Sequence, residues 1–194
     1  KAINLGIADK DTFYEQALVL YKTGYPEEAI FSLKKILEVD NRNSEAFNLI
    51  GKCLIKLRMF TEAVESFCDA IYINPDAPEY YTNLGLSLSE LGRFKDAQEC
   101  VEKAISLSDG SSYAHYLLGK IYSNSGEPKA ALEQYNIAGD LNRHDVLPII
   151  GKLDLSWNDP ELKPITLFKE VSSHLTGHLL ATESSKDILD IESV

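Results

Sequence analysis

The sequence repeats itself every 34 residues, and this period restricts the possible folds more than any other feature of the chain. Residues 10–43, 44–77, 78–111 and 112–145 align without a gap, and the aligned units form columns of small and of large apolar residues. The small columns are column 8, with Ala17, Gly51, Gly85 and Gly119, and column 20, with Ala29, Ala63, Ala97 and Ala131. A period between about 20 and 50 residues is typical of solenoids, in which each unit buries its apolar side against the next.

Each unit has the apolar spacing of two helices joined by a short break. Phe47, Ile50, Gly51 and Leu54 lie at i, i+3, i+4 and i+7, which places them on one face of a helix. The breaks fall at the same place in every unit, at Gly24-Tyr25-Pro26, Arg58-Met59-Phe60, Gly92-Arg93-Phe94 and Gly126-Glu127-Pro128. Breaks this short require the two helices to run antiparallel. The sequence therefore predicts an all-α chain of four antiparallel helical hairpins.

The pattern resembles the tetratricopeptide repeat, because the second unit carries apolar, small and proline residues at the signature positions of that family. These are Phe47, Ile50, Gly51, Leu54, Ala63, Phe67, Ala70 and Pro75. The resemblance implies a right-handed superhelical solenoid in which the first helix of each unit lines the concave side. It also implies a scaffold or adaptor that binds another protein, since the family serves many pathways without a common chemistry.

The resemblance further implies which side chains face the groove on the concave side. The candidate peptide-binding residues are Tyr14, Leu18, Tyr21, Lys22, Asn48, Lys52, Ile55, Lys56, Thr82, Asn83, Leu86, Tyr113, Tyr116 and Lys120. One rim is acidic at Asp11, Glu45 and Glu79, and the far edge is basic at Lys22 and Lys56. We therefore expect a protein or peptide partner with an apolar stripe and acidic residues. The alternative is that these side chains are only solvated.

Two well-known uses of the family fit these columns poorly. Its receptors for chaperone tails clamp a terminal carboxylate with Lys, Asn and Arg, whereas here Asn83 is the only counterpart and Leu117 replaces the expected base. Its sugar-transferring relatives present a ladder of asparagines, whereas here Asn83 lies between Leu49 and Leu117 in that column. The sequence favours neither use.

The composition disfavours several classes of partner. With 19 Lys and Arg against 30 Asp and Glu, the formal net charge is -11, which repels nucleic-acid phosphates and anionic lipid head groups. The apolar stretches are far shorter than the ~20 residues needed to cross a bilayer, so we expect no membrane insertion. Cys53, Cys68 and Cys100 lack the spacing of a zinc or redox site and favour a reducing, cytoplasmic location.

The sequence contains no catalytic motif with a specific spacing. A phosphate-binding glycine loop, a paired acid and base, and a nucleophile beside a histidine are all missing. We therefore predict no catalytic residue, no cofactor and no free-standing enzyme. Glu170, His174 and His178 share a helical face at i, i+4 and i+8, but without a HExxH motif or a nearby Cys a packed or solvated pair is the preferred interpretation over a zinc site.

The residues outside the four units divide into three segments. Residues 1–9 are expected to be an N-terminal lead-in, and residues 183–194 a flexible acidic-apolar tail, with docking of this tail into its own or a neighbour's groove as an alternative. Residues 146–182 are expected to form a connector, with turns at 147–151 and 157–160, followed by a capping helix at 164–181. Such a helix would cover the apolar end of the last hairpin.

Three functional classes remain open at this point. The chain is an adaptor that binds peptides, the targeting region of a larger enzyme such as a glycosyltransferase, or a structural subunit that self-associates through its tail or its ends. We favour the adaptor because the fold itself supplies a groove. A gene that continues well beyond Val194 would favour the second class, and a mass that rises with concentration in light scattering would favour the third.

Overall fold

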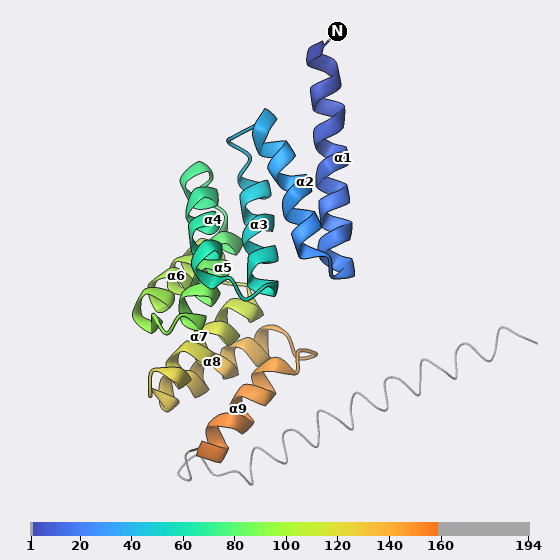
Figure 1. Ribbon diagram of the computed structural model, residues 1–194. Coiled ribbons are helices and arrows are strands. Elements are labelled where there is room, and N and C mark those ends of the chain that lie inside the picture. The colour runs from blue at the N-terminus through green and yellow to red at the C-terminus, as the bar shows by residue number, and fades with distance from the viewer. Residues whose placement is uncertain (1, 159–194) are drawn as a thin grey trace, which may run out of the picture.

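The computed structural model describes the backbone of residues 2–158 and the side chains of residues 12–155. This part of the chain is all-helical and contains no strand (Figure 1). Its helices are α1 (Ala2–Thr23), α2 (Pro26–Val39), α3 (Ser44–Lys56), α4 (Phe60–Ile73), α5 (Pro78–Glu90), α6 (Phe94–Leu107), α7 (Ser112–Asn124), α8 (Pro128–Leu141) and α9 (Leu147–Asn158).

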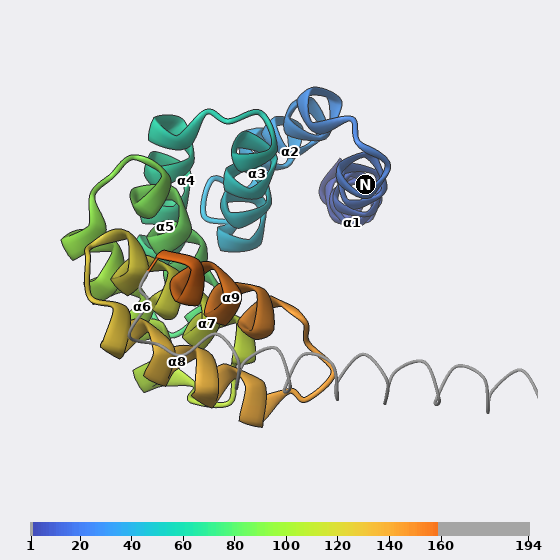
Figure 2. The ribbon, with the colours of Figure 1, turned by 90° about the horizontal axis from the view of Figure 1, so that it is seen from below.

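Consecutive helices pair into four antiparallel hairpins, α1–α2, α3–α4, α5–α6 and α7–α8. The hairpins stack in chain order, because each second helix also packs on the first helix of the next hairpin. Figure 2 shows the stack following an arc, with α1 at one end and α9 at the other. The predicted right-handed superhelical solenoid of helical hairpins is confirmed.

The turn inside each hairpin has the same backbone conformation in all four repeats. The residue at column 15 has a positive φ, with values of 92° at Gly24, 59° at Arg58, 75° at Gly92 and 84° at Gly126. The N–H of the next residue then donates to a carbonyl five residues earlier, as in Tyr25 N to Leu20 O at 2.8 Å. This hydrogen bond ends the first helix, and glycine is favoured before it because it tolerates positive φ without strain.

The helix starts are also specified locally. Proline occupies the first turn of α2, α5 and α8, where the missing N–H is not needed for helical hydrogen bonding. Asn43 accepts a hydrogen bond from Ala46 N at 2.9 Å, and Ser111 accepts one from Ala114 N at 3.2 Å. These side-chain caps satisfy N–H groups at the starts of α3 and α7.

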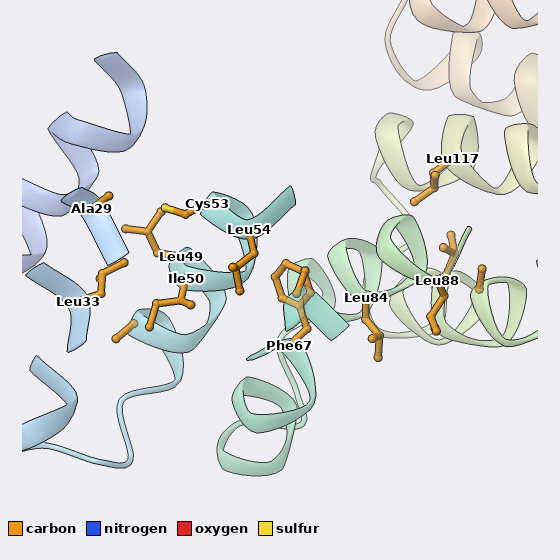
Figure 3. Close-up of a cluster of buried hydrophobic side chains, with 14 of the residues drawn as sticks. Ala29, Leu33, Leu49, Ile50, Cys53, Leu54, Phe67, Leu84, Leu88 and Leu117 are labelled. Atoms are coloured by element: carbon orange, nitrogen blue, oxygen red, sulfur yellow. The ribbon is translucent and has the colours of Figure 1, made fainter. Parts of the chain in front are cut away.

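Small residues face large ones along the whole core, as the aligned columns predict. Ala29, Ala63, Ala97 and Ala131 are all completely buried. At Gly51 an added Cβ would lie 2.5 Å from the Phe67 ring, so only glycine permits this approach of α3 to α4. Figure 3 shows Phe67 within a continuous row of apolar side chains that reaches from Leu33 to Leu117. Burial of this row is the main stabilising contribution to the stack.

The prediction of a turn-rich connector after residue 146 is wrong for residues 147–158, which form α9. Pro148 lies in the first turn, where it is compatible with a helix, and Asp145 Oδ1 accepts a hydrogen bond from Leu147 N at 3.0 Å. Gly151-Lys152 repeats the pairs Gly51-Lys52 and Gly119-Lys120, but 32 rather than 34 residues after the last of them. Helix α9 therefore takes the place of the first helix of a fifth hairpin. The 34-residue period did not reveal it because the spacing changes here.

The ends of the chain differ in how far the structure describes them. Residues 2–9, expected as a lead-in, continue α1 towards the N-terminus. The predicted capping helix at 164–181, the Glu170–His174–His178 constellation and the tail at 183–194 lie outside the described residues. Within the described range, no helix combines the length and the apolarity required to cross a membrane.

Candidate peptide-binding groove

The first helices of the hairpins form the inner layer of the solenoid. Helix α1 contacts α3, α3 contacts α5, and α5 contacts α7. The inner elements of a curved stack lie closest together, so these contacts identify the concave side, which is seen along the arc in Figure 2. We call the surface of α1, α3, α5 and α7 on this side the groove. All the predicted peptide-binding residues belong to these four helices.

The first two repeats are joined across the groove by lysines around Tyr21. Lys56 Nζ of α3 donates to the Tyr21 carbonyl oxygen of α1 at 2.7 Å. The same ammonium lies 4.0 Å from the centre of the Tyr21 ring, and that of Lys52 lies 5.7 Å from it. Both cations are thus within range of the electron-rich ring face, which attracts positive charge. Tyr21, Lys52 and Lys56 thus form one cluster that joins α1 to α3.

The second and third repeats are joined by a network of amides and charges. Lys52 Nζ donates to Glu79 Oε1 at 2.9 Å, and Asn48 Nδ2 approaches the same oxygen at 3.4 Å. Asn83 Nδ2 donates to Asn48 Oδ1 at 3.0 Å. Asn48 is only 8% exposed, so these hydrogen bonds satisfy a polar side chain that water hardly reaches.

The electrostatics of this network keep Glu79 ionised. Burial acts to raise the pKa of its carboxyl, but the hydrogen bond and the charge of Lys52, together with the Asn48 and Asn83 amides, outweigh burial. The pKa of Glu79 therefore lies below its ordinary value of 4.5. At neutral pH a full negative charge lies beside Lys52.

A second ion pair joins the third and fourth repeats. Lys120 Nζ of α7 donates to Glu90 Oε1 at the end of α5, at 3.1 Å. The side chains are 40% and 28% exposed respectively, so water screens this pair only in part. Lys52 and Lys120 both occupy column 9, and each is held by a carboxylate from α5.

Tyrosines form the apolar part of the groove at its C-terminal end. The rings of Tyr113 and Tyr116 lie 6.2 Å apart, and the rings of Tyr116 and Tyr135 lie 5.8 Å apart. Burial raises the pKa of the Tyr113 hydroxyl, and Tyr116, Glu90 and Tyr21 raise it further. Tyr21 belongs to the first repeat, so the curvature brings it within electrostatic range of Tyr113 in the fourth.

A pocket of about 310 Å³ opens where α5, the end of α6 and the start of α7 meet. Small apolar and polar side chains line it together, namely Pro78, Glu79, Thr82, Asn83, Ala104, Ser108, Ser111, Tyr113 and Ala114. Glu79 links this pocket to the Lys52 network. The pocket combines apolar surface with hydroxyl and amide groups beside a charged carboxylate, and its volume fits a single side chain of a bound chain.

The remaining predicted residues differ in their accessibility. Leu18, Ile55, Leu86 and Tyr14 are partly buried and pack against the core cluster. Thr82 is buried and its hydroxyl donates to Pro78 O at 3.0 Å, so it is a wall of the groove rather than a binding group. Lys22 is exposed in the last turn of α1. Asp11, expected on the acidic rim, lies outside the described side chains.

Sequence reasoning missed the partners of the groove lysines. It placed Glu79 on an acidic rim and counted Lys52 as available, although column 2 of one repeat lies beside column 9 of the repeat before it. Opposite charges in those two columns, Lys52 and Glu79, were the signal for this pair. Sequence reasoning also missed Ser108 and Ser111, which line the pocket from the loop before α7.

Among residues 12–155, no group of three or more histidine, cysteine, aspartate or glutamate side chains is arranged to hold a metal ion. His115 instead occupies a packing position, where its Nδ1 lies 2.9 Å from Gln134 Oε1. The described groove is a surface of hydrogen bonds, ion pairs and aromatic rings.

Comparison with known proteins identifies the repeat. The family model for the tetratricopeptide repeat matches residues 11–43, 44–77, 78–110 and 112–144. These matches confirm the four repeats predicted from the period. They cover most of the chain and leave α9 outside the family model.

Individual relatives are distant. The chain is 24% identical to anaphase-promoting complex subunit 3 of Schizosaccharomyces pombe over 190 residues, which cover 90% of this chain and 26% of that protein. The chain thus spans about a quarter of that relative. Among solved structures, MamA superposes with a TM-score of 0.74 at 21% identity, over 84% of this chain and 96% of that one. YrrB, described as a TPR protein with an unusual peptide-binding site, superposes with a TM-score of 0.66 at 20% identity, over 90% of each chain.

Proposed function

Since the chain belongs to the tetratricopeptide repeat family, we propose that it is a scaffold or adaptor whose groove binds a peptide segment of another protein. The observation that supports this proposal is that the inner helices carry two groups of aromatic and cationic side chains, Tyr21 with Lys52 on α1 and α3, and Tyr116 with Lys120 on α7. These side chains combine aromatic area, which gives affinity, with cations, which give orientation.

The chemistry of the groove favours an extended or helical segment with an apolar stripe and acidic residues. Leu18, Ile55 and Leu86 are partly buried and offer apolar contact between the charged positions. The cations lie at intervals along the inner helices, so carboxylates spaced along one chain would approach them in turn. The pocket beside Glu79, at about 310 Å³, accommodates one side chain of the same segment.

A charge-reversal experiment tests the groove. The full chain would be used to select peptides from a displayed library of random twelve-residue peptides, and binding would be repeated with Lys52→Glu and Lys56→Glu combined. The control is Lys103→Glu and Lys129→Glu combined, which makes the same charge change on α6 and α8, outside the groove. Circular dichroism would establish that both double variants remain folded.

The proposal predicts at least a tenfold loss of peptide affinity in the groove variant and a small, uniform change in the control. Equal retention of the selected peptides by both variants would show that the groove is not the binding surface. A tenfold loss corresponds to about 1.4 kcal/mol, which is within the range of a single interface residue that contributes strongly to binding.

A second candidate is the interaction region of a larger protein. It is favoured by the short share, 26%, that the chain covers of its relative from Schizosaccharomyces pombe. In this case the groove would bring a substrate or a neighbouring subunit to chemistry performed elsewhere, while the described residues would carry out no reaction themselves. The full reading frame of the gene distinguishes this candidate, because a larger protein requires a further domain outside these 194 residues.

We also propose a reducing compartment such as the cytoplasm. The chain's cysteines, Cys53, Cys68 and Cys100, are all free thiols, and Cys68 is exposed. Exposed thiols persist where glutathione keeps them reduced. Fractionation of the source cells tests this location, and recovery from an oxidising compartment would contradict it.

A further inference from the structure

The two lysines at column 9 of the groove are already held by carboxylates of the same chain. Glu79 accepts from Lys52 at 2.9 Å, and Glu90 accepts from Lys120 at 3.1 Å. Both carboxylates come from α5, so one helix neutralises cations on the helices to either side of it. A ligand carboxylate that approaches either lysine therefore competes with a carboxylate that is already bound to it.

We propose that Glu79 and Glu90 are built-in competitors that set how strongly the groove binds an acidic segment. This inference rests on the proposed function and adds to it the residues that determine selectivity. It assigns Glu79 and Glu90 the opposite role to that of the lysines: the lysines attract the ligand, and the glutamates oppose it.

Displacement is feasible because both pairs are reached by water. The Glu79 side chain is 57% exposed and the Glu90 side chain 28%. Exposed ion pairs are weak, so the internal carboxylate can move into solvent when a ligand replaces it. The lysine keeps a partner throughout, since one carboxylate is exchanged for another.

The exchange of an internal carboxylate for a ligand carboxylate affects which segments the groove selects. A segment that is acidic but not apolar gains one ion pair while the groove loses one, so its charge contributes little net affinity. A segment that adds contacts with Tyr116 and Leu86 gains apolar burial that no internal group replaces. The competitors therefore reject chains that are merely acidic and retain chains that are acidic and apolar.

The two competitors are not equally held. Glu79 accepts hydrogen bonds from both Lys52 and Asn48, and Asn83 Nδ2 donates to Asn48 Oδ1. Glu90 is held by Lys120 on the neighbouring helix. Removal of the charge at Glu79 should therefore increase the affinity of the groove for an acidic segment more than removal of the charge at Glu90.

The test uses the full chain and the random twelve-residue peptide library. Selection would be carried out at one fixed, low ionic strength with the unaltered chain, Glu79→Gln and Glu90→Gln. Glutamine keeps the shape and a hydrogen-bond acceptor while removing the charge. The matched control is Asp96→Asn, which removes one carboxylate charge from the exposed pair with Arg93, at the start of α6 and outside the groove.

The expected result is an increase in affinity of about two- to fivefold for acidic peptides with Glu79→Gln, the range over which exposed ion pairs act, and a smaller increase with Glu90→Gln. Lysine-rich peptides should show no increase. Asp96→Asn should leave acidic peptides unchanged. Equal gains in the control would assign the effect to net charge, and unchanged affinity in all variants would show that the glutamates do not compete. Either result overturns the inference while leaving the proposed function in place.

A failure of groove binding itself would give a different result from a failure of competition by Glu79 and Glu90. If the unaltered chain enriches no peptide that is sensitive to Lys52→Glu with Lys56→Glu, the proposed function fails and the competitors have nothing to oppose. Thermal melting of each variant would accompany the selection, because a merely structural role of Glu79 would lower the melting temperature without shifting the preference between acidic and basic peptides.

Discussion

The ring of Tyr135 lies against the backbone of Gly119 so closely that a Cβ at Gly119 would be 2.6 Å from the ring carbon Cε1. A Cβ at Gly151 on α9 would likewise be 2.5 Å from Cζ of the same ring. Tyr135 thus packs on both α7 and α9 and is only 3% exposed. This contact joins the last repeat to the additional helix.

Substitution of either glycine should destabilise the C-terminal end. The ring is buried and packs closely on both glycines, so it has little room to move away from a new methyl group. Gly119→Ala and Gly151→Ala should each lower the free energy of unfolding by about 1–3 kcal/mol. Urea denaturation measures this change. Gly110→Ala is the control, since a Cβ there meets no atom within 4 Å. A loss at Gly110 as large as that at Gly119 would contradict this explanation.

Arg58 is the exception among the hairpin turns, and its replacement by glycine should stabilise the chain. Its φ of 59° corresponds to a conformation that glycine adopts in the other three hairpins. Relief of this strain exceeds the entropy that glycine adds to the unfolded chain, so Arg58→Gly should raise the free energy of unfolding by about 0.5–1 kcal/mol. Thermal denaturation tests the sign. Arg58→Ala retains the strain and should give no gain; a lower melting temperature for Arg58→Gly would refute the prediction.

The lowered pKa of Glu79 predicts a dependence of stability on pH. Because its folded-state pKa lies below 4.5, the ionised carboxylate favours the folded state above the unfolded value, and this contribution is lost as the pH falls through the folded pKa. The difference in unfolding free energy between the unaltered chain and Glu79→Gln should therefore be largest above pH 4.5. It should shrink towards pH 3. A difference that stays constant across this range would mean that the carboxylate has no special partner.

The three thiols should react in a fixed order. Cys68 is exposed, Cys100 is partly buried and Cys53 is completely buried. Burial raises the pKa of Cys53 to about 11, despite the opposing effect of Lys56 and Lys52, and burial likewise raises that of Cys100 to about 11, with Cys68, Asp96 and Glu99 adding to the rise. Since the thiolate is the reactive form, N-ethylmaleimide should label Cys68 first and Cys53 last.

Mass spectrometry of quenched time points would measure that order at neutral pH. Labelling of Cys53 should follow global unfolding and accelerate in urea. Early labelling of Cys53 under native conditions would indicate local opening between α3 and its neighbours.

The repeat architecture was predictable because each of its requirements is local and recurs. Column 8 must be small wherever a large column 24 residue packs on it, as at Gly51 and Phe67, and four repetitions of that rule leave little freedom. Helix α9 was not predicted because it follows the same packing rule at a different spacing. Gly151 meets Tyr135, a residue of the preceding repeat, so the contact is visible only in three dimensions.

The sequence predicted which helices line the groove, but it did not predict which charged side chains pair there. Which helix faces inward follows from the resemblance to a known repeat, and Tyr21, Asn48 and Lys52 do lie together. The pairing of Lys52 with Glu79 depends on how far one hairpin is rotated against the next. That rotation is set by core packing and not by the groove residues themselves, so their columns alone did not reveal it.

Site-specific photocrosslinking would show where a peptide binds on the solenoid. A benzophenone amino acid would be placed at Tyr116 in the groove and, separately, at Tyr72 on α4, which is 83% exposed and outside it. Illumination with a library-selected peptide should give a covalent adduct at position 116 and none above background at position 72. An adduct at position 72 with none at position 116 would place the binding surface outside the groove and contradict the proposed function.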